Sequence, residues 1–198
     1  MFAAVIHRGL IRTCLAGLLA AAACLSACAS WHKAEEPPLL RLSPASLGRE
    51  LTVVQRMEVQ AAGQTRSLDV ALEVDAESVR MAVMQLGHTV ARLDWNGLQL
   101  VQSLAPGWPK VISAERVLSD LQLVWWPADV VQQSLPADWR LTQSSQLREL
   151  RRGDKLVTSA RIVAPGHLEL VQHAAGYTVH VYSQGAEPLF AQPPVSTP

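Results

Sequence analysis

The sequence predicts a mainly β protein of the α+β class, in which antiparallel strands precede and follow one central amphipathic helix. Along most of the chain apolar and polar residues alternate, which is the pattern of strands that bury one face. Residues 113–127 differ, because their apolar residues recur every three or four positions, as on one face of a helix. With 198 residues, of which 49% are hydrophobic, the chain is long enough for one domain with its own core and for tails.

The first 27 residues are expected to be a bacterial lipoprotein signal peptide. Arg8 and Arg12 precede an apolar run, residues 14–24, as in the charged and hydrophobic regions of a secretory signal. The tetrapeptide LSAC, residues 25–28, resembles the lipobox, whose cysteine receives diacylglycerol before the signal is cleaved. We therefore expect acyl chains such as palmitate on Cys28; an uncleaved apolar leader with incidental cysteines is the alternative.

Lipidation at Cys28 has consequences for chemistry and location. Cleavage before Cys28 would leave no other cysteine, which excludes disulfides and thiol catalysis. Acyl chains on Cys28 would hold the protein on a membrane, because each buried methylene contributes about 0.8 kcal/mol. In Gram-negative lipoproteins an aspartate after the cysteine commonly signals inner-membrane retention, so Ala29 favours the outer membrane, with the domain facing the periplasm. The formal net charge of zero shows no basic surface for nucleic acid.

The domain itself is expected over residues 49–183. Residues 28–48 are expected to be a lipidated tether, since Pro37, Pro38 and Pro44 interrupt the segment and little periodicity is present. Residues 184–198 are rich in Pro, Ser, Ala and Gln and are expected to be a disordered tail.

Five strands are expected before the helix. Turn residues separate them, and the pair Asn96-Gly97 predicts a type I′ hairpin turn. In residues 79–86 both faces are apolar, so this strand is expected to be covered on both sides. The expected strands lie in residues 51–59, 68–74, 79–86, 90–95 and 98–101.

The helix has its boundaries in the sequence. The hydroxyl of Ser113 can cap the first turn, and Pro127 cannot continue a helix. The apolar stripe contains Val117, Leu118, Leu121, Val124 and Trp125, whereas Arg116, Ser119, Asp120 and Gln122 are expected mostly off it. Such a stripe either packs on a sheet as an ordinary core helix or closes a cavity that accepts a hydrophobic ligand.

Further strands are expected after the helix. Residues 128–135 predict a short second helical turn, which Pro136 ends. Alternation then resumes between glycine-containing turns. The expected strands lie in residues 139–142, 146–151, 155–163, 167–173 and 177–182.

Catalytic, metal and cofactor motifs are absent from the sequence. No nucleophile elbow, phosphate-binding loop, dinucleotide fingerprint, zinc-protease motif or calcium loop occurs. His167, His173 and His180 lack the short spacing of zinc ligands and are interpreted as surface or strand-edge residues. Asp120 is either a buried acid or, more commonly for its type, a residue that hydrogen-bonds at the helix surface. The sequence therefore predicts no enzyme, no metal and no cofactor.

Several motifs together resemble a known family. They are the LGREL of residues 47–51, the Trp108-Pro109 pair, the LSDLQLVWWP of residues 118–127 and the REL of residues 148–150. With the lipobox, they resemble an uncharacterised family of bacterial outer-membrane lipoproteins, over roughly residues 39–183. Members are often encoded in clusters for aryl polyene pigments, beside a LolA-like carrier. The layout also resembles the LolA and LolB lipoprotein carriers, which implies a curved antiparallel half-barrel closed by a central amphipathic helix over a cavity for acyl chains.

Three functions are compatible with these observations. The first is an outer-membrane lipoprotein that binds or accepts an acyl or aryl polyene chain during envelope lipid transport, with a LolA-like periplasmic carrier as a partner. The second is a structural adaptor that recruits a partner through an exposed apolar patch at Trp108 or Trp126, and the third is an esterase that uses one of the histidines as base. For the first, the candidate cavity residues are Val70, Leu72, Met81, Val83, Leu121 and Trp125.

Overall fold

The computed structural model describes residues 36–108 and 112–183 of the chain. The predicted signal peptide, the lipidation site Cys28 and the predicted tail at residues 184–198 lie outside the described residues.

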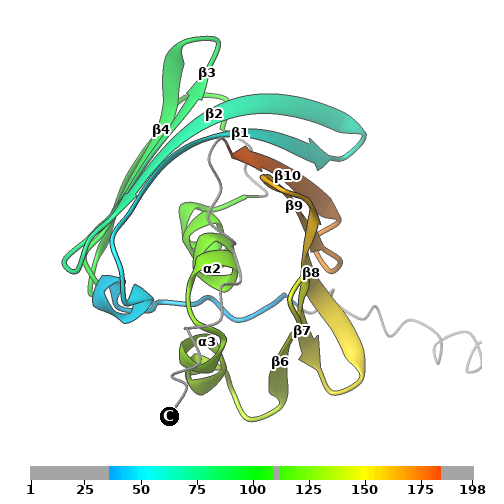
Figure 1. Cartoon of the computed structure of the whole chain (residues 1–198). Coiled ribbons are helices and arrows are strands. Elements are labelled where there is room, and N and C mark those ends of the chain that lie inside the picture. Colours follow the sequence, from blue (N-terminus) through cyan, green and yellow to red (C-terminus); the bar gives the residue numbers. More distant parts are fainter. Residues whose placement is uncertain (1–35, 109–111, 184–198) are drawn as a thin grey trace, which may run out of the picture. The chain divides into compact units, whose positions relative to one another are not determined.

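The described part is mainly β, with ten antiparallel strands in one open sheet. The sheet curves, and α2 (Ala114–Trp125) lies on its concave side (Figure 1). Across the sheet the strands are ordered β5-β4-β3-β2-β1-β10-β9-β8-β7-β6. Their bounds are β1 Leu51–Ala61, β2 Gln64–Val74, β3 Val79–Gln85, β4 His88–Trp95, β5 Leu100–Leu104, β6 Trp139–Gln143, β7 Leu147–Arg152, β8 Lys155–Ala164, β9 His167–Gln172 and β10 Tyr177–Ser183. Each strand expected from the alternation is present within a few residues of its predicted bounds.

The pairing of β1 with β10 joins the five strands before α2 and the five strands after α3 into one sheet. β1 and β10 are antiparallel over seven residue pairs, among them Met57 with Val181. All other neighbours in the sheet are consecutive in the sequence. This pair is the longest-range contact of the fold, and it places residues before and after α2 on the same inner face.

The tight turns are type I′ at two places other than the predicted one. Ala62 and Gly63 join β1 to β2 with φ of 49° and 73°, and Leu86 and Gly87 join β3 to β4 with φ of 51° and 78°. Two successive positive φ values are the signature of this turn.

The prediction of a type I′ turn at Asn96-Gly97 is wrong. Gly97 has φ of 88°, but Asn96 does not have a positive φ. Instead, Asn96 Oδ1 accepts hydrogen bonds from the backbone N–H groups of Leu98 and Gln99, at 2.9 and 2.8 Å. The asparagine therefore stabilises a longer loop through its side chain.

The central helix begins and ends as the sequence predicts. Ser113 Oγ accepts a hydrogen bond from the N–H of Arg116 at 3.2 Å, and the helix stops two residues before Pro127. A second helix, α3 (Ala128–Ser134), follows directly. The capping hydroxyl and the proline are sufficient to determine both ends locally.

The polar side of α2 is not at the surface, which corrects the amphipathic interpretation. Ser119, Asp120 and Gln122 are buried together with the apolar stripe. Gln122 Nε2 donates to the carbonyl oxygen of Leu42 at 3.0 Å, and Gln122 Oε1 accepts from the N–H of Leu42 at 3.0 Å. Ser119 Oγ accepts in the same way from the N–H of Leu40, so Ser119 and Gln122 pair with the backbone of the segment that covers them.

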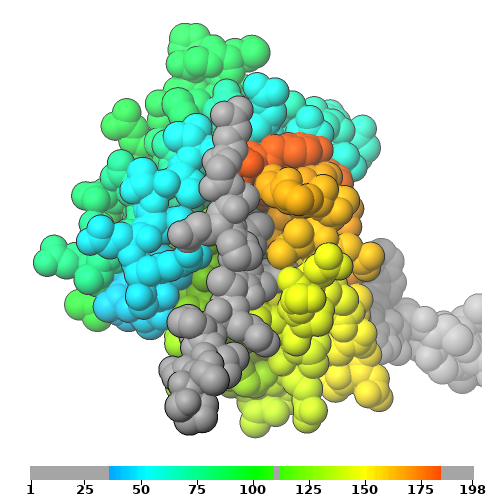
Figure 2. All heavy atoms as spheres, viewed as in Figure 1, coloured from blue at the N-terminus to red at the C-terminus, as the bar shows by residue number. Residues whose placement is uncertain are grey.

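That covering segment is the second half of the predicted tether. Residues 36–48 pack on the domain: Leu40, Leu42 and Leu47 are buried, and η2 (Pro44–Leu47) adds one turn of 3-10 helix. Figure 2 shows these residues in blue as part of the surface beside the first strands. The prolines indicated an irregular backbone correctly, but buried leucines and hydrogen bonds to α2 hold this half of the segment in place, so it does not act as a tether.

The prediction that β3 is covered on both faces is wrong. Met81 and Val83 are buried, but Ala82 and Met84 are only half-buried on the opposite face. The reason is that α2 packs against the concave face alone, and methionine and alanine tolerate partial exposure.

Candidate ligand-binding cavity

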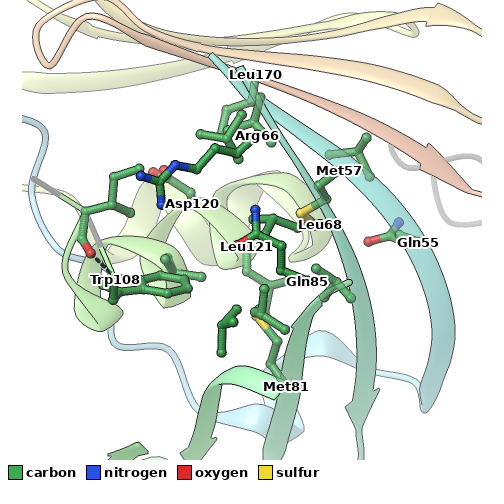
Figure 3. A pocket seen from close by; sticks show the side chains of 18 of the residues that line it. Gln55, Met57, Arg66, Leu68, Met81, Gln85, Trp108, Asp120, Leu121 and Leu170 are labelled. Atoms are coloured by element: carbon green, nitrogen blue, oxygen red, sulfur yellow. Dashed lines mark hydrogen bonds between the residues drawn. The ribbon is translucent and has the colours of Figure 1, made fainter. Parts of the chain in front are cut away.

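A cavity of about 190 Å³ lies between α2 and the inner face of the sheet (Figure 3). Its wall comes from β1 to β4, β9, β10, α2 and the chain around residues 105–108. Most of the lining side chains are aliphatic, methionine or tryptophan. The volume is somewhat larger than that of apolar cavities of about 150 Å³ that take up a benzene ring. The cavity is therefore large enough to take up an apolar group of about the size of one ring.

Five of the six residues predicted from the sequence line this cavity: Val70, Met81, Val83, Leu121 and Trp125. Leu72 does not; it is buried in the hydrophobic core. In β2 the inward residues are two apart, so Val70 and Leu72 face the same side. The cavity occupies only the part of the inner face that includes Leu68 and Val70, and the core fills the rest.

The loop before α2 supplies a tryptophan that the sequence analysis did not assign to the site. Trp108 is half-buried and lines the cavity, and its Nε1 donates to the carbonyl oxygen of Ile112 at 2.7 Å. Figure 3 shows this hydrogen bond as a dashed line. Trp126, in contrast, is fully buried, and its Nε1 donates to the carbonyl oxygen of Ser43 and to Ser46 Oγ. An exposed patch at Trp126, as the adaptor hypothesis expects, is therefore absent.

A buried polar network adjoins the cavity. Asp120 Oδ1 accepts a hydrogen bond from Gln172 Nε2 at 2.5 Å, and Asp120 Oδ2 accepts one from the hydroxyl of Tyr177. Gln172 Oε1 in turn accepts from Thr158 Oγ1 at 2.8 Å. Burial raises the pKa of Asp120 to about 6, against the lowering effect of its two donors and of Arg116. Asp120 is thus the buried acid that the sequence left open.

Burial and the neighbouring carboxylate also raise the pKa of Tyr177, so this phenol stays protonated and remains a donor to Asp120. Both side chains line the cavity. The pair of Asp120 and Tyr177 is neutral below about pH 6, where the carboxyl of Asp120 is protonated, and carries one negative charge above it.

Gln55 is a polar lining residue that the sequence did not single out. It is 2% exposed and lines the cavity from β1. Its Nε2 donates to Ser183 Oγ at 2.6 Å, whereas its Oε1 has no hydrogen-bond partner among the described residues. The sequence could have indicated this residue, because Gln55 is the one polar residue among the inward-facing positions 51, 53, 55, 57 and 59 of β1.

One rim of the cavity lies near the two type I′ turns. Arg66 and Gln85, close to the turns of β1–β2 and β3–β4, are among the lining residues, and Arg66 is exposed. Leu86 follows Gln85, is 93% exposed and has a positive φ. A leucine in this conformation is unusual, since positive φ favours glycine or asparagine. Neither burial nor backbone preference accounts for a leucine at this position.

The histidines lie outside the cavity. His167 Nε2 and His180 Nδ1 are 3.3 Å apart, and Ser159 Oγ lies 3.1 Å from His173 Nε2. None of these four residues lines the cavity. Within residues 36–108 and 112–183, no three His, Cys, Asp or Glu side chains are grouped closely enough to hold a metal ion.

In the same ranges no helix has the length and hydropathy needed to cross a membrane. Comparison with curated proteins finds no match. A family model does match, over residues 52–185, which span the ten strands of the described residues apart from Leu51, together with α2 and α3. Its description is a protein of unknown function, DUF3261, and the chain belongs to this family.

Proposed function

We propose that this protein is an outer-membrane lipoprotein whose cavity binds an acyl or aryl polyene chain during envelope lipid transport. The observation that carries the proposal is the apolar cavity beneath α2, at about 190 Å³ and lined by five residues that the sequence pattern had selected. Well-packed cores contain few voids larger than a water molecule. A cavity larger than such voids and lined mainly by apolar side chains has the kind of wall that binds apolar ligands.

The size of the cavity limits what it holds. Drug-sized ligands occupy roughly 300 to 1,000 Å³. The cavity of about 190 Å³ accommodates one ring or a short length of chain, so the remainder of a lipid extends past the rim. Partial enclosure suits a carrier or acceptor, which has to release its ligand.

The curved open sheet with a helix on its concave face supports a LolA/LolB-like half-barrel. LolB-type proteins push an exposed leucine loop into the membrane. Leu86 has the corresponding properties here: it is at a hairpin tip, almost fully exposed, and next to the cavity-lining Gln85. We infer that this tip touches the bilayer while ligand enters or leaves.

The location and the partners belong to the same proposal. Lipid on Cys28 would anchor the protein in the outer membrane of a Gram-negative bacterium, facing the periplasm, and a LolA-like periplasmic carrier would exchange ligand with it. Neither catalysis nor a cofactor is part of this role. The adaptor alternative predicted a packed interior and an exposed apolar patch at Trp108 or Trp126. The cavity and the burial of Trp126 favour the ligand-binding proposal over it, while Trp108 is half-buried.

Native mass spectrometry with lipid extraction tests the proposal. The full chain is purified under gentle conditions from a host that makes its natural envelope lipids. A bound lipid or polyene of defined mass is the expected result. A clean apo mass, together with no uptake of added lipid by a folded protein, would overturn it.

A further inference from the structure

A residue in the wall of the cavity carries a buried and unpaired hydrogen-bond acceptor. Gln55 is 2% exposed, and its Oε1 has no partner in the described ranges, although its Nε2 is bonded to Ser183 Oγ. Leaving a buried acceptor without a donor destabilises the folded state, and native proteins seldom keep such groups without a reason. A donor supplied by a ligand is one such reason.

The register of the sheet shows where this acceptor lies. Gln55 pairs with Val70 of β2, and Val70 pairs with Val83 of β3. On its other side Gln55 pairs with Ser183 of β10. In Figure 3 the amide oxygen of Gln55 is turned toward the other labelled lining residues. Across the sheet, Gln55 is therefore followed by the apolar residues Val70 and Val83 on the side of β2 and β3.

The other buried polar groups of the wall do not compete for the same role. Asp120 already accepts from Gln172 and Tyr177, and the hydroxyl proton of Tyr177 is committed to Asp120. Gln85 and Arg66 are nearer to solvent, where water can pair with them. Of the acceptors that line the cavity, Gln55 Oε1 is thus the one whose hydrogen-bonding capacity is both buried and unused.

We propose that Gln55 is a specificity-determining residue that selects a ligand with a hydroxyl group on an apolar body, such as a phenol, by accepting its O–H hydrogen bond at Oε1. This inference rests on the proposed ligand-binding function and adds the chemical class of the ligand. The cavity volume of about 190 Å³ is sufficient for the ring, and Val70 and Val83, next in the row of paired residues, offer the ring apolar contacts.

The test compares two probes that differ in whether the phenol oxygen carries a proton or a methyl group. Binding of para-butylphenol and of its methyl ether, para-butylanisole, is measured by isothermal titration calorimetry on the full chain kept in solution by an amphipathic polymer. Wild-type protein is expected to bind the phenol roughly tenfold more tightly, the worth of one hydrogen bond to a buried acceptor. Gln55→Met, which keeps the length of the side chain without its amide, is expected to bind the two probes equally.

A matched variant separates this effect from a general change in the strand. Gln60→Met makes the same replacement in β1 at an exposed residue outside the cavity lining, and the preference for the phenol should be unchanged. Gln55→Met removes the buried acceptor that lacks a donor, so the melting temperature of this variant should not be lower than that of the wild type. The comparison of the two probes on wild-type protein needs no variant and stands even if one fails to fold.

The outcomes distinguish the two levels of the proposal. If neither probe binds the wild-type protein, the ligand-binding function itself fails. Equal binding of both probes would retain the cavity as a binding site and overturn the role of Gln55. A preference for the phenol that persists in Gln55→Met would assign the selection to another residue and would also overturn it.

Discussion

Arg148 Nη1 in β7 donates a hydrogen bond to the carbonyl oxygen of Trp126 at 2.7 Å, immediately after the last residue of α2. The same nitrogen donates to the carbonyl oxygens of Leu123 and Val124, at 2.7 and 3.3 Å. Arg148 as a whole residue is 3% exposed. Burial lowers the pKa of Arg148 to about 10, so the side chain stays charged at neutral pH. A buried cation at the negative end of the helix dipole thus attaches α2, and with it one wall of the cavity, to the C-terminal half of the sheet.

Arg148→Lys should therefore destabilise the protein although the charge is kept. A lysine ammonium cannot reproduce the planar set of donors to three carbonyls and to Gln143 Oε1. We expect a loss of about 2 to 4 kcal/mol in the free energy of unfolding, measured in urea. Arg161→Lys, at an exposed position of β8, is the matched control and should change it by less than about 0.5 kcal/mol. Equal effects of the two variants would contradict the capping role.

Asp120 predicts a specific pH dependence of stability. Its folded-state pKa of about 6 lies above the ordinary value of 3.8, so the folded state holds a proton that the unfolded state releases between these values. The contribution of this group is fully present below about pH 4 and is lost as the pH rises through 6. Its cost at neutral pH is on the order of 3 kcal/mol.

Asp120→Asn should remove this dependence. The amide oxygen can still accept from Gln172, and the hydroxyl of Tyr177 can accept from the amide nitrogen. The free energy of unfolding of the variant minus that of the wild type should rise between pH 4 and pH 7 and then stay constant. Asp94→Asn, at an exposed position in β4, should give a nearly flat difference. A flat difference for Asp120→Asn as well would show that its carboxyl is ionised normally.

Filling the cavity should abolish ligand uptake without unfolding the protein. Val83→Phe adds a ring to a residue that lines the cavity, and the available 190 Å³ can hold it. We expect no bound lipid in native mass spectra and a melting temperature that does not fall, because the ring occupies empty space. Val54→Phe, on the exposed face of β1, should leave lipid binding intact. Retained lipid in Val83→Phe would place the ligand elsewhere.

Leu86 should matter for exchange with a membrane and not for stability. Leu86→Asp places a charge on the hairpin tip, and aspartate tolerates positive φ better than leucine does. We expect slower uptake of fluorescent lipid from vesicles at an unchanged free energy of unfolding. Leu98→Asp, on the loop between β4 and β5 and 89% exposed, is the control and should transfer lipid at the wild-type rate. Equal slowing by both variants would point to a general charge effect.

The sequence by itself determined the local structure. Alternation along β1 to β10 placed every strand, because a half-buried strand needs a period of two whatever its partner is. Ser113 and Pro127 determined the ends of α2 through contacts within the helix itself. The same pattern indicated the inward residues, and five of the six chosen for the cavity line it.

Only the tertiary structure decided what the polar residues do. Ser119 and Gln122 are buried because residues 36–48 pack on that side of α2, which no local period reveals. Asp120 is buried against the sheet instead, where Gln172 and Tyr177 donate to it. The positive φ of Leu86 depends on the register of β3 and β4. A shift of the turn by one residue would change this register, and residue propensities do not distinguish the two turns. The unpaired oxygen of Gln55 depends on the pairing of β1 with β10, since that contact brings Ser183 to its amide nitrogen and leaves the oxygen without a partner in the cavity wall. Long-range pairing therefore produced the site, because polar groups find their partners across strands that the sequence keeps far apart.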